Sequence, residues 1–147
     1  MKIAIGCDPN AEIAKQNLIE YMRKMNCGKI TDFGSTDPIY CNVAIKVAEE
    51  VAKGNFDCGI LLCGTGIGMS IAANKVKGAY AAVLSDIYSA KRARLSNDAN
   101  IACFGAFTTG EKVREELLSI FLTNKFVSGS PSQPKIDAIK KYEQERK

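Results

Sequence analysis

The chain has 147 residues, of which 46% are hydrophobic and 24% are charged, and it carries a formal net charge of +4. Its length suits a single domain over residues 1–147 with a substantial core, and no apolar run approaches the ~20 residues that would span a bilayer. Because basic and acidic residues are interleaved, we expect neither nucleic-acid binding nor membrane association.

The N-terminus and the cysteines indicate the compartment. Residues 1–8, MKIAIGCD, contain too short an apolar run for a secretory signal, so we expect a cytoplasmic protein with free thiols. The chain has six cysteines and no histidine, and the closest pair, Cys58 and Cys63, is not spaced as zinc ligands are. We therefore predict neither a metal nor a cofactor, and we assign Cys7, Cys58 and Cys103 to the core.

Short apolar runs alternate with helical patterns along the whole chain. This alternation is typical of parallel strands joined by crossover helices, and strands that are apolar throughout indicate a sheet covered on both faces. The sequence therefore predicts an α/β fold with a five-stranded parallel sheet. The predicted strands are residues 2–6, 29–33, 58–62, 79–84 and 100–105.

Apolar residues that recur every three or four positions predict the helices of the first half. The first helix should end at Gly28 and the second near Gly54. The third should run from about residue 66 to Lys75. The residues at this spacing are Ala14, Leu18, Tyr21, Met22 and Met25 in the first helix, and Val43, Val47 and Val51 in the second.

Three more helices are predicted in the second half. Ser85 or Asp86 can cap the fourth, and Thr108 and Glu111 have the spacing of a capping box for the fifth. Residues 135–146 should form a polar terminal helix. The predicted apolar face of the fifth helix contains Val113, Leu117, Ile120 and Phe121.

The stretch CGTGIG, residues 63–68, is the main candidate for chemistry. Ligands of open parallel sheets bind beyond the carboxyl ends of the strands, and this stretch follows the third predicted strand. A glycine-rich turn can aim backbone N–H groups at an oxyanion, and the adjoining helix N-terminus adds positive charge. The same field favours the thiolate of Cys63, a candidate base or nucleophile. The structural alternative is a tight turn that needs glycine, with a small apolar residue before it.

Three stretches, MKIAIGCD, CGTGIGMSIAANK and YSA…NDAN, resemble ribose-5-phosphate isomerase B and the related galactose-6-phosphate isomerase subunits. The resemblance extends through about Phe126. It implies a Rossmann-like three-layer α/β/α sandwich, assembled as a homodimer or a dimer of dimers with shared active sites. It also implies aldose–ketose isomerisation of a phosphorylated sugar through an enediolate.

The resemblance also assigns roles to residues of this chain. Cys63 would be the base that moves a proton between C1 and C2 of the sugar, and the Thr65 hydroxyl would assist. Asp8 would contact the sugar and is the third candidate catalytic residue. The other matching positions are Gly64, Gly66, Ile67 and Gly68 in an anion hole, and Tyr40, Asn97 and Asn100 at the sugar.

The chain departs from the family pattern where relatives have histidine. Pro9 and Ser96 occupy two such positions, and a histidine at the second would help to open the sugar ring. Since general acid–base catalysis contributes about 10²- to 10⁴-fold, its loss matters most for a cyclic substrate. Either Asp8 takes over ring opening, or the substrate is largely open-chain.

The phosphate-binding end differs as well. Residues 128–135, SGSPSQPK, replace a clamp that is rich in histidine and arginine in relatives. Lys135 matches one of its arginines but supplies a point charge instead of a bidentate fork. We expect Arg92, Arg94 or Lys91 to compensate, supplied by a partner subunit.

The expected substrate pair is ribose 5-phosphate and ribulose 5-phosphate. The alternatives are another four- or six-carbon sugar phosphate, or a non-catalytic subunit that binds a sugar phosphate or supports an active partner. Cys63 and Thr65 argue against the non-catalytic alternative, because a pure binder needs no base. Structural roles also stay open for Asp8 as a helix cap, Tyr40 as a packing aromatic, Asn97 and Asn100 as turn residues, and residues 89–94 as a solvated face.

Overall fold

Five parallel strands form one sheet in the order β2-β1-β3-β5-β4 in the computed structural model, which describes residues 1–146. The predicted five-stranded parallel sheet is therefore confirmed. The strands are β1 (Lys2–Cys7), β2 (Lys29–Asp32), β3 (Cys58–Cys63), β4 (Ala81–Val83) and β5 (Ile101–Gly105). A short 3₁₀ turn, Pro9–Ala11, is followed by the helices α1 (Glu12–Lys24), α2 (Tyr40–Ala52), α3 (Ile67–Ala73), α4 (Ile87–Leu95), α5 (Glu111–Thr123) and α6 (Gln133–Glu145).

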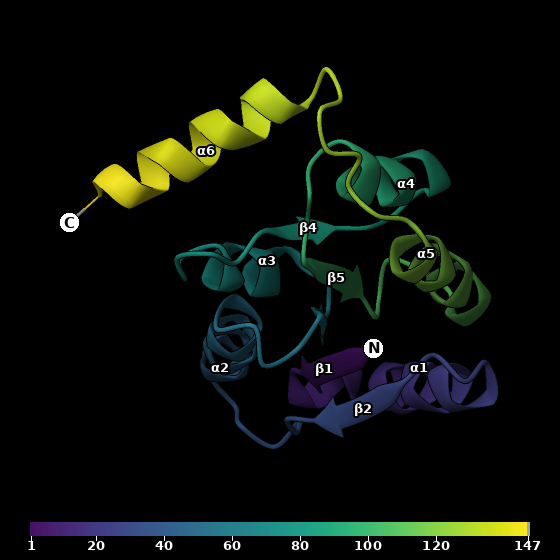
Figure 1. The fold of residues 1–147 in the computed structure, drawn as a ribbon. Coiled ribbons are helices and arrows are strands. Elements are labelled where there is room, and N and C mark those ends of the chain that lie inside the picture. The colour runs from purple at the N-terminus through teal and green to yellow at the C-terminus, as the bar shows by residue number, and fades with distance from the viewer. Residues whose placement is uncertain (147) are drawn as a thin grey trace.

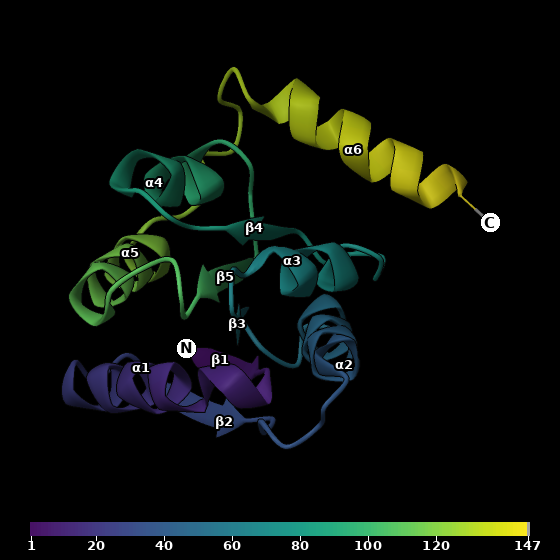
Figure 2. The ribbon, with the colours of Figure 1, turned by 180° about the vertical axis from the view of Figure 1, so that it is seen from behind.

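Helices cover both faces of the sheet, so the molecule has the three layers of a Rossmann-like α/β/α sandwich (Figures 1 and 2). Helices α1, α4 and α5 pack on one face and α2 and α3 on the other. Since successive strand residues point to opposite faces, Ile60 joins the first core and Leu61 the second. Both cores need apolar side chains, which explains the uninterrupted apolar runs of β1, β3 and β5.

Several helix ends differ from the prediction. Helix α1 ends at Lys24, and Asn26 adopts the left-handed conformation that reverses the chain before Gly28. The predicted capping box is wrong: α5 begins at Glu111, after Gly110 and without a side-chain cap. The Thr108 hydroxyl instead donates to the Gly105 carbonyl at 3.5 Å. Of the two candidate caps of α4, Asp86 is the one used, because its carboxylate accepts from the Ser89 N–H at 2.8 Å.

The buried face of α5 also differs. Val113, predicted to be buried, is 46% exposed, whereas Arg114 is only 6% exposed. The buried apolar residues of this helix are Leu117, Leu118, Phe121 and Leu122. Position 114 lies three and four residues before the first two, so the helix turns its arginine inward.

Helix α6 lies along the outside of the molecule, beyond α4 and β4 (Figures 1 and 2). The Glu143 carboxylate accepts from the Gly78 N–H at 3.0 Å and from the Tyr80 hydroxyl at 2.7 Å. Burial, together with this hydrogen bond to Glu143, raises the pKa of Tyr80 to about 12. A second tether joins Lys140 to Asp98 at 3.3 Å.

Strand β4 is an edge strand of only three residues. Its outer side is covered by a side chain: the Asn74 amide donates to the Ala81 carbonyl at 2.9 Å and accepts from the Ala81 N–H at 2.8 Å. The predicted strand over residues 79–84 is therefore longer than the observed one, although Ala79 and Leu84 at its ends are buried.

All six cysteines are free thiols. Cys7, Cys58 and Cys103 are buried as predicted, and burial raises the pKa of Cys7 and Cys58 to about 12. Across residues 1–146, no helix combines the length and the apolar character that a membrane crossing requires.

Candidate active site

The candidate site lies at the switch point of the sheet, between β1 and β3, where the crossover helices change from one face of the sheet to the other. Strands β1 and β3 are neighbours, but the helix after β1 packs on one face and the helix after β3 on the other. Such a switch opens a crevice at the carboxyl ends of the two strands, where ligands of parallel sheets bind. Asp8 follows β1 and donates its N–H to the Leu62 carbonyl at 2.9 Å, which places it beside the Cys63 turn.

The loop after β5 orients the turn after β3. The Ala106 N–H donates to the Cys63 carbonyl at 2.8 Å, and the Phe107 N–H donates to the Gly64 carbonyl at 3.0 Å. In a trans peptide the N–H points opposite to the C=O. The N–H groups of Gly64 and Thr65 therefore point away from the β5–α5 loop. Within residues 1–146 neither has a hydrogen-bond partner, so both are free to bind an oxyanion.

Cys63 lies at the base of this turn and is 6% exposed, so it is largely shielded from bulk water. The Gly66 N–H donates to its sulfur at 3.0 Å. This hydrogen bond holds the sulfur within the turn. The Ile67 N–H also has a partner, because it donates to the Thr65 hydroxyl oxygen at 3.2 Å. Two of the predicted anion-hole residues thus direct their amides at the turn's own side chains.

Two glycines of this turn have no room for a side chain. Gly66 has a φ of 80°, and a Cβ there would meet the Phe104 backbone at about 3.0 Å. At Gly68 a Cβ would overlap the Tyr40 hydroxyl. The glycines thus fix the turn against β5 and let Tyr40 approach the start of α3. Because α3 has only seven residues, the oriented amides of the turn supply most of the expected field and the helix dipole adds little.

Tyr40 is brought to the site by the first turn of α2. The neighbouring Cys41 thiol is the main cause of a raised Tyr40 pKa, with contributions from burial and from Cys63. Tyr40 therefore remains a neutral phenol that can donate a hydrogen bond to a sugar oxygen. It also packs partly against the core beneath α2 and α3, so its packing role and its place at the site coexist.

The Asp8 carboxylate accepts from the Asn10 N–H at 2.7 Å and caps the 3₁₀ turn that leads into α1. The structural role considered for Asp8 is therefore present. The cap also holds this carboxylate at the carboxyl end of β1, beside the crevice. Contact with a sugar stays a prediction.

A buried lysine that the sequence reasoning missed supports this side of the site. Lys15 is 1% exposed, and its ammonium lies 2.9 Å from Asp32 and 3.2 Å from Glu12. Burial alone would lower the pKa of Lys15, but hydrogen bonds to Asp32 and Glu12 outweigh it and raise that pKa. Its position three residues before the buried Leu18 and seven before Met22 was the available signal.

Asn100 is not brought to Cys63 within one chain. It precedes β5 and therefore lies at the amino ends of the strands, whereas Cys63 lies at their carboxyl ends. Its side-chain amide accepts from the Tyr80 N–H at 2.8 Å and donates to the Gly78 carbonyl at 2.9 Å. This is the turn-stabilising role that the sequence left open for Asn100.

The predicted phosphate and sugar contacts of the second half also lie apart from Cys63. Arg92 and Asn97 line a groove of about 270 Å³ between α4 and β4, and Lys135 is exposed on α6. Arg94 is held by the fold, because its guanidinium donates to the carbonyls of Asn124 and Ala99. The expectation that Arg94 binds phosphate therefore conflicts with its contacts.

Comparison with known proteins agrees with this geometry. Residues 3–139 match the family model described as Ribose/Galactose Isomerase. A Listeria innocua protein named Ribose-5-P isomerase B is 46% identical, with all of both chains covered. A Pectobacterium atrosepticum protein named D-erythrulose-4-phosphate isomerase is 40% identical over 100% of this chain and 98% of its own.

Solved structures agree as well. The type B ribose 5-phosphate isomerase from Trypanosoma cruzi superimposes with a TM-score of 0.92 at 38% identity, over 99% of this chain and 100% of that one. The family model covers most of the chain and the sequence matches are full-length. The chain therefore belongs to the ribose/galactose isomerase family of sugar-phosphate isomerases.

Proposed function

We propose that this protein interconverts ribose 5-phosphate and ribulose 5-phosphate, with Cys63 as the base. The observation that carries the proposal is the Cys63 sulfur, which accepts the Gly66 N–H at 3.0 Å beside the outward-facing amides of Gly64 and Thr65. A base next to oriented donors is what proton abstraction beside a carbonyl requires. The relatives named ribose-5-phosphate isomerases support the five-carbon substrate.

The reaction comprises three proton transfers, and Cys63 performs the first and the last. The Cys63 thiolate removes the C2 proton of the open-chain aldose, and the electron pair moves through the new C1–C2 double bond onto O1. The amides of Gly64 and Thr65 bind this oxyanion. The Thr65 hydroxyl oxygen accepts from the Ile67 N–H, so its proton is free to be donated to the sugar. The proton of the sugar's C2 hydroxyl then passes from O2 to O1, and Cys63 returns to C1 the proton that it removed from C2.

A four-carbon substrate is the second candidate, and the absence of histidine from the whole chain favours it. A pentose 5-phosphate closes into a ring through O4 and needs an acid or base to open it. A tetrose 4-phosphate has its O4 blocked by phosphate and so remains open-chain. Having Pro9 and Ser96 in place of histidine would then not reduce activity. The relative named D-erythrulose-4-phosphate isomerase also supports this substrate.

Isomerase assays on four-, five- and six-carbon sugar phosphates test the function. The wild-type chain should turn over one of them, and Cys63→Ala should abolish turnover while sugar-phosphate binding persists. Cys63→Ser keeps the size of the side chain but raises the pKa of the base, so it should lose most of the activity. Binding without turnover of any substrate by the wild type would support the non-catalytic alternative instead.

A second copy of the chain would complete the site. Large apolar side chains are exposed on α3, β4, the start of α4 and the β5–α5 loop; they are Ile67, Ile71, Val83, Ile87, Tyr88 and Phe107. A patch of this kind suits a subunit interface. The groove that holds Arg92 and Asn97 adjoins the patch through Val83 and Tyr88. We infer that these two residues reach the Cys63 turn of a partner chain, in a homodimer or a dimer of dimers.

Complementation tests the shared site. Cys63→Ala and Asn97→Ala should each be inactive alone. Random mixing of the two should restore about a quarter of wild-type activity, because half of the dimers are hybrids and each hybrid keeps one intact site. Failure of the mixture to regain activity, although sedimentation shows hybrid dimers, would contradict a site shared between subunits.

A further inference from the structure

Arg114 is a buried cation without an acidic partner. It lies in the first turns of α5, is 6% exposed, and its Nε has no hydrogen-bond partner within residues 1–146. No carboxylate of the described chain forms an ion pair with it; Glu111 and Glu115 act on it only through space. Burial lowers the pKa of Arg114, but an arginine stays charged at neutral pH. Among the described residues, the protein therefore keeps a buried positive charge without an ion-pair contact behind the β5–α5 loop.

The guanidinium is directed at the carbonyls of that loop. Its Nη1 donates to the Thr109 carbonyl and approaches the Ala106 carbonyl at 3.5 Å. Both carbonyls belong to residues 106–110, the segment that separates β5 from α5. Arg114 thus fixes the loop from within the fold.

The Ala106 carbonyl is the start of a chain of hydrogen bonds that ends at the crevice. It shares a peptide unit with the Phe107 N–H, which donates to the Gly64 carbonyl at 3.0 Å. The Gly64 carbonyl in turn shares a peptide unit with the Thr65 N–H, which points away from the β5–α5 loop. Both of these peptide bonds are trans, as are the others in residues 1–146, so the dipoles of the two units align from the guanidinium toward the oxyanion position.

We propose that Arg114 is a positioning residue of the isomerase, which fixes and polarises the Thr65 N–H through the Ala106–Phe107 and Gly64–Thr65 peptides. This inference rests on the proposed function, since the Thr65 N–H matters because an enediolate oxygen forms in front of it. Chains of hydrogen bonds strengthen one another by about 10–30% per bond, and a positive charge at the donor end acts in the same direction. Arg114 itself does not touch the substrate.

Arg94 provides a matched control. Its guanidinium also donates to two backbone carbonyls, those of Asn124 and Ala99, and it stacks on Phe121 with 4.9 Å between the guanidinium carbon and the ring centroid. Its carbonyl partner Ala99 precedes β5, at the amino edge of the sheet. Arg94→Met therefore removes a similar set of fold contacts without touching the chain of peptides that leads to Thr65.

The experiment compares Arg114→Met, Arg114→Gln and Arg94→Met with the wild type. On the preferred sugar phosphate, Arg114→Met should lower kcat by about three- to tenfold, with KM changed less than about twofold. Its affinity for the aldonohydroxamate phosphate of the same chain length, whose anionic oxygen mimics the enediolate, should fall in parallel. Its affinity for the matching alditol phosphate, which has no such oxygen, should stay unchanged. Arg94→Met should lower the melting temperature but leave the ratio between the hydroxamate and alditol affinities at its wild-type value.

Three outcomes would overturn the proposal. They are an unchanged kcat and hydroxamate affinity in folded Arg114→Met, an equal loss of affinity for the alditol phosphate, and the same kinetic losses in Arg94→Met. Should Arg114→Met fail to fold, Arg114→Gln keeps an amide donor but has a shorter reach and no charge, and wild-type kcat in that variant would likewise contradict polarisation.

Hydrogen exchange of the Phe107 amide separates this inference from the proposed function. Exchange should be faster in both Arg114 variants, because the loop that holds this amide is loosened, and unchanged in Arg94→Met. If the wild type turns over no sugar phosphate, the proposed function fails while the exchange data still decide whether Arg114 holds the turn. Wild-type exchange at Phe107 in both variants would refute the positioning role directly.

Discussion

Replacing Lys15 by methionine should lower the free energy of unfolding more than the replacement of an exposed helical lysine does. The ammonium of Lys15 is buried and lies 2.9 Å from Asp32 and 3.2 Å from Glu12. Removing one partner of a buried ion pair costs about 3–5 kcal/mol. Here the side chains of Glu12 and Asp32 are 41% and 37% exposed, so both regain water and the expected loss is about 2–3 kcal/mol.

A loss of that size should lower the melting temperature of a chain of this length by about 5–10 °C. Thermal denaturation followed by circular dichroism at fixed protein concentration measures it. Lys112→Met is the matched control, because Lys112 forms the same three-residue helical pair with Glu115 at 3.0 Å but is 84% exposed. A melting temperature of Lys15→Met no lower than that of Lys112→Met would refute the assignment of Lys15 as a buried tie between α1 and β2.

The same cluster predicts a pH dependence. Hydrogen bonds from Ser35 and Gln16, with a contribution from Lys15, lower the pKa of Glu12 from 4.5 to about 2. A carboxyl group whose pKa is lowered by folding stabilises the fold above its unfolded pKa, and this stability is lost as the pH falls through the folded pKa. The free energy of unfolding should therefore decrease between about pH 4.5 and pH 2, and urea titrations should show a smaller decrease in Lys15→Met.

Two further predictions concern the site and the terminal helix. Gly68→Ala should displace the Tyr40 hydroxyl and lower kcat/KM by ~10-fold or more, whereas Gly110→Ala, which has open space around its Cα, should leave kcat/KM unchanged. Glu143→Ala should release α6 to proteolysis and lower the pKa of Tyr80, since a hydrogen bond to Glu143 adds to the effect of burial. An ultraviolet titration of Tyr80 that matches the wild type would contradict that tether.

The sheet was predictable because its strands are local apolar runs, but the helix ends were not. Gly28 looks like a helix stop, yet Asn26 reaches the left-handed conformation first and ends the helix earlier. Thr108 and Glu111 have capping-box spacing, yet the threonine turns back to the Gly105 carbonyl. In both cases several residues compete for one local role, and tertiary contacts that the sequence does not display decide between them.

The site divides in the same way. The turn at residues 63–68 was predictable because its donors and its thiol are contiguous in sequence. Lys15 and Arg114 were missed because a charged residue in a helix is normally assigned to the solvated face, although both fall on buried stripes. Asn100 was assigned to the sugar, and only the pairing of its amide with Tyr80 and Gly78 places it at the other edge of the sheet.

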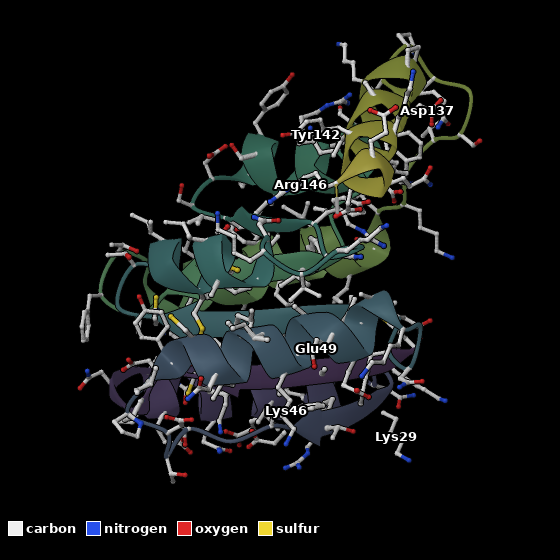
Figure 3. The ribbon with its side chains drawn as sticks, turned by 90° about the vertical axis from the view of Figure 1, so that its left-hand side faces the viewer. Lys29, Lys46, Glu49, Asp137, Tyr142 and Arg146 are labelled. Atoms are coloured by element: carbon white, nitrogen blue, oxygen red, sulfur yellow. The ribbon has the colours of Figure 1, made fainter. Side chains whose placement is uncertain are left out.

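Figure 3 shows α2 and α3 side by side in front of the sheet, and the chain that leaves α3 continues into β4. The Asn74 amide after α3 pairs with both outward-facing polar groups of Ala81, as a neighbouring strand would. Bare strand edges recruit foreign backbones and seed aggregates. A single carboxamide thus occupies the outward-facing backbone of Ala81 and shortens the stretch of this edge to which a foreign strand could add.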